Sequence, residues 1–244
     1  MGISSPERVK LSVLLPMHNE AARVERCIQE VENVVKCFSS SYEIVVVEDG
    51  STDGTDKIAA RLTELNPKVK MLHFPVRLGK GKAIKNAFGV AKGDVIVLLD
   101  ADLATGLDYL PLLVRTTEEC GGMVVGSRLV FGSSVRRPIS RTLLSLVYNF
   151  LVRLLFHDGV HDHQCGFKAF SRDLTMELRK KTVADGFFVD TEFIVNAKRL
   201  GYPITEIAVV WAEPRGKGES KVRPLREALK MGFELLQLRL SINE

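Results

Sequence analysis

Residues 95–105 read VIVLLDADLAT, in which five consecutive aliphatic residues end at two aspartates, Asp100 and Asp102. A continuous aliphatic run of this length is typical of a strand that is buried on both faces. Residues two apart in an extended chain point to the same side, so the two carboxylates would repel each other unless a cation lies between them. This stretch therefore predicts a buried strand that ends in a cation site.

The same pattern recurs through the first half of the chain. Apolar runs predict strands at 11–16, 43–47, 69–74 and 94–99, separated by helical patterns at about 20–38, 54–65 and 80–91. This alternation predicts an α/β fold, with a mostly parallel, Rossmann-like sheet and helices on both faces. Ligands of such sheets bind at the carboxyl ends of the strands.

Polar clusters follow each of the four predicted strands, and together they predict a nucleotide-type crevice. The clusters are His18-Asn19-Glu20, Glu48-Asp49-Gly50-Ser51, the loop from Arg77 to Lys82, and Asp100-Ala101-Asp102. The loop RLGKGKA (77–83) carries glycines and cations before a predicted helix, which favours an anion cradle, although it lacks the spacing of a P-loop. Paired carboxylates beside such a loop are typical of Mg²⁺ or Mn²⁺ bound to a diphosphate.

The composition indicates a globular chain of 244 residues with 45% hydrophobic content, long enough for one large domain or two subdomains. We find no signal peptide, and no apolar run reaches the ~20 residues of a membrane-spanning helix. The four cysteines form no C-x-x-C pair, which predicts reduced thiols on the cytosolic side. The string HDHQC (161–165) is too compact to favour a tetrahedral zinc site.

The net charge of +4 is concentrated in one segment. No acidic residue occurs between Cys120 and His157, where five arginines lie: Arg128, Arg136, Arg137, Arg141 and Arg153. A localised cationic segment predicts an anionic partner. A solvated basic face is the alternative, and the charge pattern leaves both open.

Two amphipathic patterns occupy the second half, after a short predicted strand at 123–128. Within 142–156, Arg141, Ser145, Asn149 and Arg153 recur every four residues as one narrow polar stripe on an otherwise apolar helix. This pattern favours burial within the protein over a position in a membrane interface. Leu225, Leu229, Phe233, Leu236 and Leu240 form a second apolar ridge, which predicts a surface helix packed on the core.

Several motifs occur in order from about Lys10 to Val222 and carry a resemblance to a known family. They are PMHNE (16–20), EDGSTDGT (48–55), RLGKGKA (77–83), DADLAT (100–105), GSR (126–128), DHQCGFKAF (162–170) and GESK (218–221). Together they resemble the inverting, GT-A-fold glycosyltransferases of family 2 that load a hexose onto dolichyl or polyprenyl phosphate.

The resemblance implies a single GT-A domain over 1–244, with a nucleotide-sugar half at about 10–127 and an acceptor half at about 128–244 that includes membrane-interface helices. It assigns nucleotide binding to Pro16, His18, Glu20, Glu48, Asp49, Lys80 and Asp100. It places the metal on Asp100 and Asp102. The acceptor and diphosphate ligands are Arg128, Arg136, Arg137, Arg141, Gln164, Ser220 and Lys221. The catalytic group would be Asp100, Asp102, Asp162 and Arg128.

The implied activity is metal-dependent, inverting transfer of a hexose to dolichyl or polyprenyl phosphate, using Mg²⁺ or Mn²⁺. The strings DADLAT and DHQCGFK are closer to the UDP-glucose branch than to the GDP-mannose branch, which remains the alternative donor. A non-catalytic nucleotide-binding or membrane-tethering module is the alternative from another class, although the intact aspartates argue against it. The expected partners are a nucleotide sugar, a lipid phosphate and the cytoplasmic membrane surface, reached as a peripheral protein or as the catalytic domain of a membrane protein, with no nucleic acid.

Overall fold

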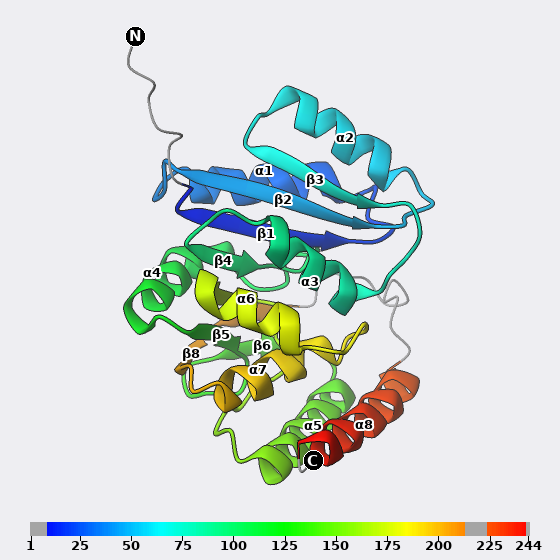
Figure 1. Cartoon of the computed structure of the whole chain (residues 1–244), viewed down its shortest axis with the longest axis vertical. Coiled ribbons are helices and arrows are strands. Elements are labelled where there is room, and N and C mark those ends of the chain that lie inside the picture. The colour runs from blue at the N-terminus through cyan, green and yellow to red at the C-terminus, as the bar shows by residue number, and fades with distance from the viewer. Residues whose placement is uncertain (1–8, 213–223, 243–244) are drawn as a thin grey trace.

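The predicted parallel sheet is present in the computed structural model, which describes residues 9–212 and 224–242, and the side chains of these except 224–229 (Figure 1). Its first four strands are β1 (Leu11–Met17), β2 (Tyr42–Asp49), β3 (Val69–Phe74) and β4 (Val95–Leu98). They pair in parallel in the order β3-β2-β1-β4. β1 and β2 are almost fully buried, as their continuous aliphatic composition predicts.

The three predicted crossover helices are also present, as α1 (Val24–Val35), α2 (Thr55–Leu65) and α3 (Lys80–Val90). On α1 the buried side chains recur at helical spacing, including Val24, Ile28, Val31 and Val35, so one apolar stripe faces the sheet. α1 lies behind the sheet in the view of Figure 1, whereas α3 lies in front of it. The helices therefore cover both faces.

The second half of the chain extends the same sheet. β5 (Met123–Ser127), β7 (Lys168–Ser171) and β8 (Ile204–Ala208) complete the order β3-β2-β1-β4-β7-β5-β8. β7 runs antiparallel to both β4 and β5. β7 was not predicted from the sequence, because it is only four residues long and carries Lys168 inside an apolar run.

Four short helical segments join these strands: η1 (Leu107–Tyr109), α4 (Leu110–Cys120), α6 (Arg172–Lys181) and α7 (Val189–Arg199). α3, α6 and α7 pack together in front of the sheet (Figure 1). A small second sheet pairs β6 (Ser134–Arg136) with β9 (Val210–Ala212), and Thr105 forms a bridge with Trp211. These pairings bring the basic segment next to the turn that follows β4.

The remaining two helices, α5 (Ile139–Phe156) and α8 (Pro224–Ser241), pack against each other at one end of the molecule (Figure 1). Five buried residues form a separate apolar cluster beneath them: Val152, Phe188, Val195, Met231 and Leu235. This small core lies apart from the large apolar core around the sheet.

The expectation that α5 is buried was wrong. Only Asn149 and Val152 are buried on this helix, whereas Ile139, Leu143 and Phe150 are 86%, 61% and 58% exposed. The polar stripe faces the protein and the apolar side faces outward. With 18 residues and a mean hydropathy of 1.4, α5 also has the length and composition of a membrane-crossing helix. The sequence had predicted no such helix, because no apolar run reaches ~20 residues.

The ridge predicted on α8 is also turned outward where its side chains are described. Phe233, Leu236 and Leu240 are more than half exposed, while Met231 and Leu235 are the residues that pack inward. Leu225 and Leu229 belong to the part of α8 whose side chains are not described. The two helices therefore present neighbouring apolar surfaces to the surroundings.

Candidate active site at the carboxyl end of the sheet

Asp100 and Asp102 lie in a turn that follows β4, not in the strand itself. β4 ends at Leu98, and Leu103 N donates to Asp100 O at 3.0 Å, with a positive φ of 49° at Leu103. The extended geometry that we assumed for these residues is therefore wrong. Even so, both aspartates line one cavity, together with Gly166, Phe167 and Trp211 among others.

The cation that balances Asp100 in the described structure is Lys80. Its Nζ lies 3.0 Å from Asp100 Oδ1 and 2.9 Å from Asp190 Oδ2. Burial opposes the charge on Lys80, but the two carboxylates outweigh burial and raise its pKa. Asp190 in turn pairs with the fully buried Lys168 at 2.6 Å, so the charges alternate along a chain from Asp100 to Lys168.

The backbone of Gly166 lies directly against the carboxylate of Asp100. A Cβ built on Gly166 would lie 1.8 Å from Asp100 Oδ2, closer than any van der Waals contact allows. Gly166 therefore leaves the space in which this carboxylate sits. Gly166 lies within a motif of the resemblance, but no physical reason for a glycine there could be read from the sequence.

Several backbone donors of the predicted anion cradle at residues 77–83 are already occupied within the protein. Leu78 N and Gly79 N donate to the two oxygens of Asp49 at 2.6 and 3.0 Å, and Gly81 N donates to Asp185 O. Asp49 is buried, and its carboxylate holds this loop instead of facing outward. The side chain of Lys80 therefore adds positive charge near the cavity.

Glu48, predicted to contact the nucleotide, is fully buried at the end of β2. One oxygen accepts from Ser51 N at 2.6 Å and the other lies 2.6 Å from His73 Nδ1. Its side chain is thus occupied in shaping the turn. Glu20 is also buried, 3.4 Å from Arg23, and this pair closes the loop before α1.

His18 and Pro16 lie at the carboxyl end of β1, beside the end of β2. Pro16 is half-buried within β1. His18 Nδ1 lies 2.8 Å from the carbonyl oxygen of Asp49, and because a carbonyl can only accept, this nitrogen carries the proton. The structure thus brings the first two predicted clusters together at one edge of the sheet.

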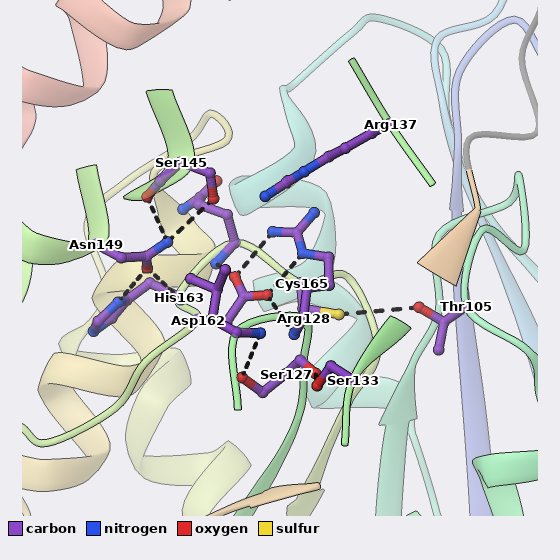
Figure 2. A network of polar contacts seen from close by, with 12 residues as sticks. Thr105, Ser127, Arg128, Ser133, Arg137, Ser145, Asn149, Asp162, His163 and Cys165 are labelled. Atoms are coloured by element: carbon purple, nitrogen blue, oxygen red, sulfur yellow. Dashed lines mark hydrogen bonds and ion pairs between the residues drawn. The ribbon is translucent and has the colours of Figure 1, made fainter. Parts of the chain in front are cut away.

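Arg128 and Asp162 form a bidentate ion pair (Figure 2). Arg128 Nε and Nη2 lie 2.7 and 2.9 Å from the two oxygens of Asp162, and Arg128 N donates to the same carboxylate at 3.0 Å. Burial opposes ionisation of Asp162, but the charge and hydrogen bonds of Arg128 prevail and lower its pKa to about 2. Asp162 has no exposed surface, so it can influence a reaction only through the residues that it holds.

The other predicted acceptor ligands are spread over the basic segment. Arg136 is exposed at the end of β6, Arg141 is half-buried on α5, and Arg137 Nε donates to Thr142 Oγ1 at 3.1 Å. Gln164 Nε2 donates to Thr191 Oγ1 at 2.7 Å. Ser220 and Lys221 lie outside the described residues.

Four residues of this region escaped the sequence analysis: Lys168, Asp190, Thr191 and Trp211. Trp211 stacks near Arg128, with 5.6 Å between the guanidinium carbon and the ring centroid. Lys168 gave a usable signal, because a lysine inside the apolar run CGFKAF requires a buried anionic partner. Nothing in the sequence indicated that this partner is Asp190.

The donor set at the cavity suits a divalent cation that is shared with a ligand. No cluster of three or more His, Cys, Asp or Glu side chains suited to a metal occurs among the described residues. Asp100 and Asp102 supply hard oxygen ligands at a polar cavity, and Mg²⁺ or Mn²⁺ commonly completes its shell with water and substrate phosphate. The two aspartates therefore fit a metal that a diphosphate helps to hold.

The family model for glycosyl transferase family 2 matches residues 12–179, which run from β1 through β7 and include Asp100, Asp102 and Asp162. The chain belongs to glycosyl transferase family 2. The resemblance and the GT-A fold predicted from the sequence are thereby confirmed.

Curated relatives of this family 2 glycosyltransferase cover nearly its whole length. It is 39% identical over 232 residues to "Glycosyltransferase AglD" of Haloferax volcanii, matching 94% of this chain but only 37% of that protein. It is 32% identical to "Dolichyl-phosphate beta-glucosyltransferase ALG5A" of Trichomonas vaginalis, over 97% of this chain and 75% of the relative. The chain thus spans about a third of the first relative and three quarters of the second.

Among solved structures, the glucosyl-3-phosphoglycerate synthase of Mycobacterium tuberculosis has the same fold, with a TM-score of 0.68 and 25% identity. The match covers 96% of this chain and 79% of that enzyme, which was solved with Mn²⁺, UDP and glucosyl-3-phosphoglycerate. The likeness therefore extends over the whole domain.

Proposed function

We propose that this chain transfers glucose from UDP-glucose to dolichyl or another polyprenyl phosphate, with inversion at the anomeric carbon. The observation that carries the proposal is the cavity in which Asp100 and Asp102 meet beside Lys80, at the carboxyl end of the sheet. Similarity to a dolichyl-phosphate β-glucosyltransferase supports the choice of lipid and sugar.

Asp100 and Asp102 would hold Mg²⁺ or Mn²⁺, and the Mn²⁺ and UDP in the mycobacterial neighbour support this assignment. When bound, the metal would neutralise charge that develops on the departing diphosphate. Lys80 keeps Asp100 in place from the other side, and Gly166 leaves room for it. His18, at the end of β1, would face the nucleoside.

The acceptor needs no strong general base. A phosphate monoester carries about −1.5 to −2 charges at neutral pH, so one of its oxygens can attack the anomeric carbon directly while the nucleoside diphosphate leaves. The demand on the protein is to bring two anions together, which cationic side chains can meet. Arg136, Arg137 and Arg141 would attract the lipid phosphate, and the Arg128–Asp162 pair would order the segment that carries Gln164.

The outward apolar surfaces of α5 and α8 would place this site at the cytoplasmic surface of a membrane. Their exposed leucines and phenylalanines suit the acyl boundary, and the neighbouring arginines suit anionic headgroups. We propose that α5 lies in the interface and does not cross the bilayer, because Asn149 near its middle is bound to the body of the protein.

A panel of nucleotide sugars tested against a polyprenyl phosphate with Mn²⁺ or Mg²⁺ examines the activity, and calorimetry with UDP and GDP examines the donor. We expect lipid-linked glucose from UDP-glucose and tighter binding of UDP than of GDP. A clear preference for GDP would move the chain to GDP-mannose and leave the mechanism standing. Absence of transfer from every donor, with nucleotide still bound, would favour a non-catalytic module.

A further inference from the structure

Two adjacent polar residues of α5, Tyr148 and Asn149, face the protein while their neighbours do not. Asn149 has no exposed surface, whereas Val147 and Phe150 on either side of the pair are 52% and 58% exposed. A polar pair whose only role is to dock a helix on the protein could contact any part of the molecule. These two reach the residues that directly follow Asp162.

The side chain of Asn149 holds His163 (Figure 2). Its Oδ1 lies 2.8 Å from His163 N and 2.7 Å from His163 Nδ1, while its Nδ2 donates to Ser145 O at 2.8 Å. A backbone N–H can only donate, so the oxygen of Asn149 must face His163, and Nδ1 of the ring must also donate to it. Asn149 therefore accepts two hydrogen bonds from one residue.

The opposite edge of the same imidazole is held as well. His163 Nε2 lies 2.9 Å from Asp158 Oδ2, and neither side chain has more than a trace of exposed surface. Because Nδ1 already donates to Asn149, the contact at Nε2 is made with a proton on His163 or on Asp158. The imidazole ring of His163 is thus held at both edges, by Asn149 within α5 and by Asp158 just after the end of α5.

Tyr148 reaches the next residue, Gln164, through Thr191. Tyr148 Oη lies 2.7 Å from Thr191 Oγ1, and Gln164 Nε2 donates to the same hydroxyl at 2.7 Å. Burial raises the pKa of Tyr148, so its hydroxyl keeps its proton at neutral pH. Two adjacent residues of α5 therefore hold two adjacent residues that follow Asp162: Asn149 binds His163, and Tyr148 reaches Gln164 through Thr191.

We propose that Tyr148 and Asn149 are positioning residues, which set Gln164 and, through Asp162, Arg128 for the acceptor and so join the lipid-facing helix to the site. This inference rests on the proposed function for its substrate. The carboxylate of Asp162, the residue before His163, accepts three hydrogen bonds from Arg128, so a shift of His163 would be transmitted to that guanidinium over a single residue. The competing view is that the pair only docks α5 on the protein.

The decisive comparison is between Asn149→Ala, which removes the acceptor, and Asn149→Asp, which keeps an oxygen for both donors of His163. Asn86→Ala is the matched control, since Asn86 Nδ2 also donates to a carbonyl four residues earlier, Lys82 O, but lies on α3. Kinetics with polyprenyl phosphate, UDP affinity, thermal stability and amide hydrogen exchange would be measured for each variant.

We expect Asn149→Ala to lower kcat/KM for the lipid phosphate by about tenfold or more, as for other residues that orient catalytic groups. UDP affinity should stay within about twofold, and peptides covering 160–167 should exchange about tenfold faster, because His163 N loses its acceptor. Asn149→Asp should restore most of both effects. Tyr148→Phe should cost about fivefold, the size of one hydrogen bond.

A kcat/KM for Asn149→Ala within about twofold of wild type would overturn the inference, as would an Asn149→Asp variant no better than the alanine variant. A lower melting temperature with unchanged kinetics would assign the pair to docking alone. If the wild-type protein transfers nothing to any polyprenyl phosphate, the proposed function fails, while unchanged exchange over 160–167 would separately refute the anchoring.

Discussion

At the scale of single residues, Asp100 and Asp102 differ in what surrounds them. Asp100 contacts Lys80 through one oxygen and lies against Gly166 with the other, whereas Asp102 accepts from Ala104 N at 3.2 Å. The repulsion that the sequence implied is thus relieved on one side by a side chain of the protein. A metal ion bound at the cavity would therefore contact two aspartates of which one, Asp100, is already paired with Lys80.

Replacing either aspartate by asparagine should lower kcat/KM by on the order of 10²-fold, as for the loss of a group that stabilises charge in the transition state. Removal of divalent metal with EDTA should abolish transfer, and Mn²⁺ should restore it. Steady-state kinetics with a metal titration would check both. Full activity in EDTA, or in the double asparagine variant, would contradict the metal assignment.

Gly166→Ala should displace the Asp100 carboxylate, because the new Cβ would lie 1.8 Å from its Oδ2. We expect binding of UDP with Mn²⁺ to weaken by about tenfold or more, since carboxylate ligands tolerate little displacement. Calorimetry measures the affinity, and circular dichroism verifies that the variant folds. Gly121→Ala is a useful comparison, because it meets no neighbouring atom and carries only the strain of its positive φ.

The Arg128–Asp162 pair predicts a pH dependence of stability. The pKa of Asp162 is about 2 in the folded protein and about 3.9 in an unfolded chain, so the pair stabilises fully above about pH 4. This contribution is lost as the pH falls through about 2. The free energy of unfolding of wild type should therefore exceed that of Asp162→Asn by several kcal/mol at pH 6.

Urea titrations of both proteins between pH 6 and pH 2 would test that prediction. The difference between them should shrink below pH 4, because the unfolded carboxyl then takes up a proton that the folded one does not. A difference that stays constant over this range would show that Asp162 contributes no proton-linked stability.

At the scale of elements, α5 is the helix whose burial the sequence misjudged. A helix with a narrow polar stripe can bury its apolar side in a core or present it to a lipid surface, and the pattern is the same in both cases. Here Asn149 and its partners draw the stripe inward, so the wide apolar side faces out. The face of α5 that packs on the protein is thus set by its contacts with the loop at 158–164.

Replacing Arg136, Arg137 and Arg141 together by alanine should weaken binding to anionic vesicles, where each cation contributes roughly 1 kcal/mol. Wild-type binding should also weaken with salt, because exposed charges are screened. Vesicle sedimentation measures this, with UDP affinity expected to stay unchanged. Removal of two charges from α6, by Lys180→Ala with Lys181→Ala, should leave sedimentation unaffected.

At the scale of the whole molecule, the two halves share one sheet. β7 belongs to the acceptor half, yet it pairs between β4 and β5, and Lys80 of the first half bonds Asp190 of the second. The boundary at about residue 127 therefore separates the proposed donor and acceptor roles, but it does not separate two sheets, because strands from both sides pair in one sheet.

A fragment of residues 1–127 should consequently fail to fold, because β4 and β5 would both lack their shared partner β7. The full chain should unfold in one transition, followed by both fluorescence and circular dichroism. Amide dispersion in the NMR spectrum of the fragment would check the first expectation. A well-dispersed spectrum would show that the first half is an independent unit.

The sequence by itself determined the parallel part of the sheet, its crossover helices and the edge at which the polar clusters gather. Continuous aliphatic runs such as 95–99 admit little but a buried strand, and parallel strands place their carboxyl ends together. The ordered motifs determined the family, because a set spread over the whole chain is far more specific than Asp100-x-Asp102 alone.

Tertiary structure alone decided what the individual side chains do. It turned Asp49, Glu48 and Asp162 into buried acceptors for neighbouring loops, and it supplied Lys80 and Asp190 as the partners of Asp100 and Lys168. Such partners lie up to 110 residues apart, and no local pattern encodes them. Whether a carboxylate binds a ligand or a loop depends on which donors the fold brings within about 3 Å of it.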